Sequence, residues 1–130
     1  MECNRLKRVF VALPSFWNDW IDAGMTDFDL ANLEFELLRD PNKGDLLQET
    51  GGIRKTRFAR PGSGKSSGMR VFYLDLKSKQ KIFLLAVIQK NEKSNLSKSE
   101  RNEFATLVKF LKEETYESIQ KTKTGPRRSN

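Results

Sequence analysis

Four segments of the chain combine β-branched and aromatic residues with turn residues at their ends. They cover residues 6–13, 53–59, 69–76 and 81–90, and this pattern predicts strands. In the segment 53–59 the strand period of two places Lys55 and Arg57 on one face and Thr56 and Phe58 on the other. The segment 81–90 is apolar without alternation, which is typical of a central strand covered on both faces.

Three other segments show the spacing of helices. Residues 14–25 can form a short helix that ends near Gly24. Thr26 with Asp29 resembles a capping box, and leucines recur at helical spacing through 30–38. Ser97 with Glu100 forms a second capping box, ahead of an apolar stripe that reaches roughly residue 120. The order β-α-α-β-β-β-α predicts an α+β fold with a mainly antiparallel sheet packed against helices.

Length and composition indicate one domain with no metal or membrane chemistry. The chain has 130 residues, which suits a single domain over 1–120 followed by a basic, disordered tail over 121–130. Cys3 is the only cysteine and histidine is absent, so an intrachain disulfide is excluded and no zinc site is expected. The longest apolar run, 82–88, is far too short to span a bilayer. These features predict a cytoplasmic protein without a cofactor.

Positive charge is concentrated in one part of the chain. The formal net charge is +7, and the stretch 51–70 contains no acidic residue. A basic stripe of this kind suggests a polyanionic partner, most often a nucleic acid. The basic residues of the stripe are Arg54, Lys55, Arg57, Arg60, Lys65 and Arg70.

The stretch "RPGSGKSSGMRV" (60–71) looks at first like a phosphate-binding P-loop. That motif needs a glycine five residues before Gly64, where this chain has Ala59, and it must lead into a helix rather than a strand. The stretch therefore predicts a glycine-rich, basic hairpin loop in which Lys65 can donate to phosphate oxygens. The alternative is a flexible, solvated turn.

Residues 43–97 resemble the RelE/HigB family of toxins from bacterial toxin–antitoxin modules. The resemblance lies in "GD", "TGGIRK", a "GxGK…GxRVxY" hairpin and "KNEKSNL", in this order and spacing. It implies a RelE-like fold and a toxin that enters the ribosomal A site and cuts mRNA without a metal. It also implies a cognate antitoxin, often a helix-turn-helix protein. Cleavage would proceed by attack of a ribose 2′-hydroxyl on the adjacent phosphate.

The resemblance assigns catalytic roles to the basic stripe. Lys55 and Arg57 match the family's paired basic positions on one strand, and Arg70 matches its phosphate-gripping arginine. Prearranged cations stabilise the phosphorane transition state, which gains negative charge. Lys55 is also a candidate base for the 2′-proton, because clustered like charges favour the neutral amine. The residues expected to bind RNA are Arg54, Arg60, Lys65, Tyr73 and Lys93, with sheet packing as the alternative for Tyr73.

The chain departs from better-known RelE members near Asn91 and Ser97, where an arginine and a tyrosine are missing. Lys90 or Lys93 can replace the group that protonates the leaving 5′-oxygen, and Lys90 joins the catalytic set. Three alternatives to an mRNA endonuclease remain: a ParE-like inhibitor of DNA gyrase, an inactive member that binds only RNA or antitoxin, and a generic nucleic-acid-binding domain.

Overall fold

The computed structural model describes residues 7–60, 68–89 and 95–113. The order of elements matches the expected β-α-α-β-β-β-α, with one added two-residue strand, β2, and a 3-10 turn at Lys77–Lys79. The predicted helix end near residue 120 and the predicted tail lie outside the described residues. The elements are β1 (Val9–Ala12), α1 (Pro14–Asp22), α2 (Asp27–Arg39), β2 (Asp45–Leu46), β3 (Ile53–Phe58), β4 (Met69–Leu76), β5 (Lys81–Gln89) and α3 (Lys98–Glu113).

The strands form one sheet in the order β1-β5-β4-β3-β2. β1 runs parallel to β5, and the other three pairings are antiparallel, which confirms the mainly antiparallel sheet. β5 lies between β1 and β4, and every residue from Ile82 to Ile88 is buried. The prediction of a central strand covered on both faces is therefore confirmed.

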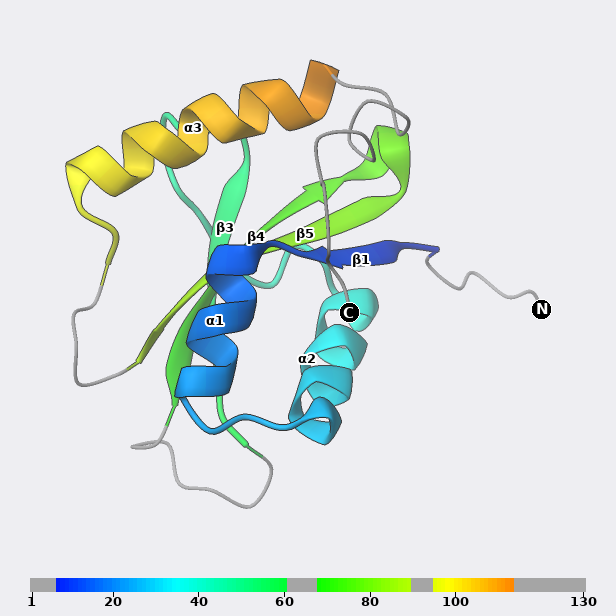
Figure 1. Cartoon of the computed structure of the whole chain (residues 1–130). Coiled ribbons are helices and arrows are strands. Elements are labelled where there is room, and N and C mark those ends of the chain that lie inside the picture. Colours follow the sequence, from blue (N-terminus) through cyan, green and yellow to red (C-terminus); the bar gives the residue numbers. More distant parts are fainter. Residues whose placement is uncertain (1–6, 61–67, 90–94, 114–130) are drawn as a thin grey trace.

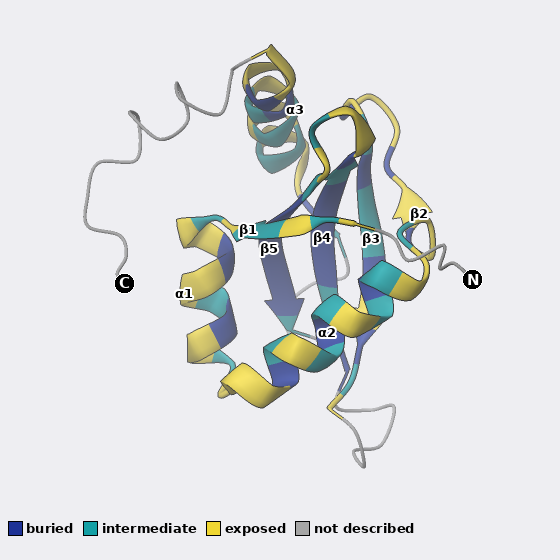
Figure 2. Cartoon of the chain, turned by 90° about the vertical axis from the view of Figure 1, so that its right-hand side faces the viewer, coloured by how far each residue is buried: buried dark blue, intermediate teal, exposed yellow. Residues whose placement is uncertain are grey.

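Helices cover both faces of the sheet (Figure 1). On one face, α1 and α2 pack Phe16, Trp20 and Leu33 against β4 and β5. On the other face, α3 packs Val108 and Leu111 against the same two strands and β3. Figure 2 shows that buried positions on the helices turn toward the sheet while exposed ones face outward. Within residues 7–60, 68–89 and 95–113, no helix has the length and apolar character that a bilayer crossing requires.

Both predicted capping boxes are present. The Thr26 hydroxyl accepts from the backbone N–H of Asp29, and the Asp29 carboxylate accepts from the backbone N–H of Thr26. Ser97 and Glu100 exchange the same two bonds at the start of α3. These bonds satisfy backbone donors that the first turn of a helix leaves unpaired.

Candidate nucleic-acid interface

Three of the predicted catalytic cations lie on the same face of the sheet. Lys55 and Arg57 are two residues apart on β3, so their side chains share one face. Arg70 is the direct cross-strand partner of Arg57. Ile53 and Phe72, which occupy this face, pack in the core beneath α3. α3 therefore covers this face of the sheet at Ile53, and the three cations lie on the same face, farther along β3 and β4.

The three cations have open side chains. Arg57 is exposed, and Lys55 and Arg70 are half-buried. None of these three side chains makes a hydrogen bond or ion pair with another described residue. Like charges directly opposite each other on neighbouring strands destabilise a sheet. The Arg57–Arg70 pair therefore favours a bound anion, whose charge would remove the repulsion.

Arg54 lies on the opposite face from Lys55, away from the three cations, and its contact with RNA stays a prediction. Its guanidinium donates to the carbonyl oxygen of Gly44 at 2.7 Å and to that of Asn42 at 3.4 Å. These bonds attach the loop before β2 to β3. Because successive side chains of a strand point to opposite faces, the sequence alone already predicts that residues 54 and 55 lie on different faces.

Tyr73 is fully buried, so the prediction that it stacks on a base is wrong and the alternative of sheet packing is confirmed. Its hydroxyl donates to the carbonyl oxygen of Pro41 at 2.7 Å and accepts from the backbone N–H of Gly44 at 3.1 Å. Burial raises the pKa of the Tyr73 hydroxyl. The side chain therefore serves as a neutral anchor for residues 41–44.

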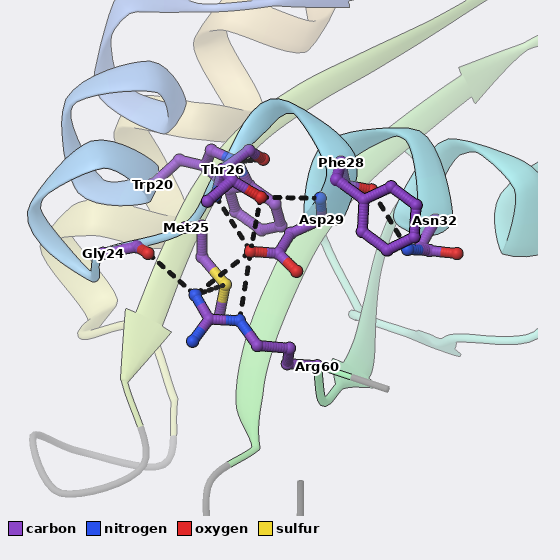
Figure 3. A network of polar contacts seen from close by, with 8 residues as sticks. All are labelled: Trp20, Gly24, Met25, Thr26, Phe28, Asp29, Asn32 and Arg60. Atoms are coloured by element: carbon purple, nitrogen blue, oxygen red, sulfur yellow. Dashed lines mark hydrogen bonds and ion pairs between the residues drawn. The ribbon is translucent and has the colours of Figure 1, made fainter. Parts of the chain in front are cut away.

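Arg60 is held by the protein itself, in the network shown in Figure 3. Its Nε donates to the Asp29 carboxylate at 3.1 Å, and its terminal nitrogen donates to the Gly24 carbonyl oxygen at 2.7 Å. Asp29 is 2% exposed, so the ion pair is buried on the acid's side. Arg60 therefore joins the end of β3 to the turn between α1 and α2, and its contact with RNA stays a prediction. The sequence predicts that Asp29 caps α2, but no local pattern predicts that it pairs with Arg60.

The remaining predicted residues, Lys65, Lys90 and Lys93, lie outside the described residues. The strands around the glycine-rich stretch are described, and β3 and β4 pair antiparallel from Phe58 and Met69 inward. A strand, not a helix, therefore follows that stretch, as the rejection of a P-loop requires.

Asp45 belongs to the same surface and was not among the predicted site residues. It is the cross-strand partner of Lys55 on the short strand β2. Direct partners place their side chains on the same face, with Cβ atoms about 5 Å apart. The dipeptide "GD" (residues 44–45) is part of the family resemblance, but the sequence does not show that Asp45 lies beside Lys55.

A comparison with family models gives the family of this chain. The model described as the RelE toxin of the RelE/RelB toxin–antitoxin system matches residues 36–126, well over half of the chain. The chain belongs to the RelE toxin family. This toxin is also similar to a solved structure of the free Escherichia coli toxin RelE in which two arginines are replaced by alanine. The TM-score is 0.49 at 18% identity, with 78% of this chain and 96% of that chain covered.

Membership of the family makes the protein the toxin of a toxin–antitoxin system and implies an antitoxin as its partner. The predicted RelE-type toxin and its α+β fold are thus confirmed. The matched range contains β2, β3 and β4, and with them all three open cations and Asp45.

Proposed function

We propose that this toxin is a ribosome-dependent, metal-free mRNA endonuclease that blocks translation. The observation that carries the proposal is the group of open cations on one sheet face, with Arg57 directly opposite Arg70 and Lys55 on the same strand as Arg57. The family supplies the role of a toxin. The cations supply the positive charge that stabilises the transition state of RNA backbone cleavage.

The chemistry follows from the charge of the reaction. When the 2′-oxygen attacks phosphorus, the phosphorane gains negative charge relative to the bound mRNA. Fixed cations at that position therefore stabilise the transition state more than the ground state. Arg57 and Arg70 can each place two N–H donors on phosphate oxygens, because a guanidinium is planar and forked.

The ribosome would supply the orientation of the substrate. Holding the 2′-oxygen in line with the leaving 5′-oxygen converts loose encounters into near-attack geometry, which by itself accelerates such reactions by orders of magnitude. Accordingly we propose cutting of mRNA in the A site rather than of free RNA. Lys65, Lys90 and Lys93 stay in the proposal as further cations toward the RNA.

The test is cleavage of a reporter mRNA on translating ribosomes by the purified toxin, with the 5′ ends of the fragments mapped. We expect cuts in phase with codons, and no cuts in the same RNA without ribosomes. Arg70→Ala should lower the cleavage rate by about 10²–10³-fold, the loss typical of one transition-state donor.

Two control variants make this result specific. Arg70→Lys keeps the charge but loses the fork, so it should retain part of the activity. Lys109→Ala removes a positive charge from the exposed surface of α3 and should cut like the wild type. Growth arrest without RNA cleavage, accompanied by trapped gyrase, would contradict the proposal and favour inhibition of gyrase.

A further inference from the structure

Hydrogen bonds to β3 and β4 hold both ends of the two-residue strand β2. The Arg54 guanidinium and the Tyr73 hydroxyl both bond to Gly44, directly before the strand. The backbone N–H of Leu47, directly after it, donates to the carbonyl oxygen of Ile53 at 2.8 Å. Both ends of β2 are thus fixed against the rest of the sheet.

Gly44 brings this strand close to β3. A Cβ at position 44 would lie 2.8 Å from the carbonyl oxygen of Lys55 and 3.1 Å from the Tyr73 hydroxyl. Any other residue would push β2 away from Lys55. The close approach places the next residue, Asp45, in register with Lys55.

Asp45 is the carboxylate that the described strands bring to the face of the cations. These strands contain two acidic residues, Asp45 and Asp75. Asp75 lies on the other face, where it forms a nearly buried pair with Arg8 at 2.6 Å. Asp45 is exposed, and its side chain makes no hydrogen bond or ion pair with the residues that the structure describes.

We propose that Asp45 is the general base of the cleavage reaction and that Lys55 acts as a cation beside it. This inference rests on the proposed function. Aspartate is ionised at neutral pH and can accept a proton. A lysine opposite an aspartate is a favourable cross-strand pair, which suits Lys55 to holding phosphate rather than taking the proton.

The 2′-oxygen forms a bond to phosphorus, and its proton moves to the Asp45 carboxylate. The bond from phosphorus to the 5′-oxygen breaks, and that oxygen takes a proton from water. The products are a 2′,3′-cyclic phosphate and a 5′-hydroxyl, and Asp45 returns its proton to solvent.

The experiment measures single-turnover cleavage on mRNA-programmed ribosomes. We expect Asp45→Asn to lower the rate by about 10²–10⁴-fold, the usual contribution of a general base. Asp45→Glu, which keeps a carboxylate, should retain more activity than Asp45→Asn. Glu49→Gln removes the same charge from an exposed residue in the turn between β2 and β3 and should match the wild type.

A second measurement separates a proton acceptor from a residue that only shapes the site. Added formate should raise the rate of Asp45→Ala in proportion to its concentration, and acetate, a stronger base, should raise it further. Chloride at the same ionic strength should not. Binding of the variant to ribosomes and its melting temperature should equal those of the wild type, because Asp45 is exposed.

The outcomes separate the two proposals. If the wild type does not cut, the proposed function fails. If the wild type cuts and Asp45→Asn cuts within about threefold of it, the role of Asp45 fails and the nuclease stands. An inactive Asp45→Ala that neither formate nor acetate restores also overturns the role as proton acceptor.

Discussion

Replacing Asp29 by asparagine should destabilise the fold, because this one carboxylate serves three donors. It accepts from the backbone N–H of Thr26 at 2.9 Å, from the Thr26 hydroxyl at 3.0 Å and from Arg60 at 3.1 Å. The side chain of Asp29 is 3% exposed, while that of Arg60 is 45% exposed. All three bonds end on the same oxygen, Oδ2, so the amide oxygen of asparagine can replace it as acceptor, but the bonds lose their charge and Arg60 loses its ion-pair partner.

The expected loss of stability follows from these contacts. A hydrogen bond to a charged group contributes about 1.5–3 kcal/mol net, and a negative charge in the first turn of a helix adds about 0.3–1 kcal/mol. Asparagine keeps part of the cap, so we expect a loss of about 2–3 kcal/mol. For a domain of this size that lowers the melting temperature by roughly 6–12 °C.

The pH dependence of the free energy of unfolding tests the same prediction independently. Burial by itself raises the pKa of Asp29, but the hydrogen bonds from Thr26 and Arg60 outweigh it and hold the pKa below the ordinary 3.8. A carboxyl whose pKa is lower in the folded protein stabilises the fold above its unfolded pKa. That contribution disappears as the pH falls through the folded pKa. The difference in the free energy of unfolding between the wild type and Asp29→Asn should therefore be constant above about pH 5 and shrink in acid.

The assay is urea unfolding followed by circular dichroism between pH 3 and pH 7. Asp27→Asn is the matched control, because Asp27 is an exposed acid in the same first turn. We expect it to cost about 0.3–1 kcal/mol, the contribution of the first-turn charge alone. The reasoning is refuted if Asp29→Asn costs no more than Asp27→Asn, or if the gap stays constant down to pH 3.

Three further substitutions test other parts of the structure. Arg57→Met should raise the free energy of unfolding by about 0.2–1 kcal/mol, because it removes the repulsion from Arg70. It should also lower the cleavage rate, because it removes a cation of the site. A loss of stability in urea unfolding would contradict the first expectation. Tyr73→Phe should cost about 1–2 kcal/mol, since it leaves the two loop groups bonded to the buried hydroxyl without that partner; unchanged urea midpoints would exclude that anchor. Gly51→Ala should cost about 1–3 kcal/mol, because Gly51 has φ +84° and a Cβ there would lie 2.9 Å from a methyl group of Val108; calorimetry showing an unchanged melting temperature would disprove it.

The positions of the helices and strands could be predicted because they depend on residues within a few positions of one another. The Thr26–Asp29 and Ser97–Glu100 boxes each span four residues, and both formed as predicted. The unbroken apolar run at residues 82–88 already indicated a strand covered on both faces. The same period of two along 53–58 assigned Lys55 and Arg57 to one face.

The contents of the candidate site were decided by pairings between distant segments. Arg60 and Asp29 are 31 positions apart, and Tyr73 reaches Pro41 over 32, so no local pattern could reveal that these two predicted RNA-binding residues hold the fold together. A single step of strand register would also have moved Asp45 away from Lys55.

The sequence alone thus determined the elements, their caps and the face that each strand residue occupies, because spacing along the chain defines them. Only the tertiary structure determined which charges meet. It set Arg57 against Arg70 and Asp45 beside Lys55, and it paired Arg60 with Asp29. Strand order and register depend on contacts that form after the chain has folded back on itself, and these contacts are where the chemistry of the site arises.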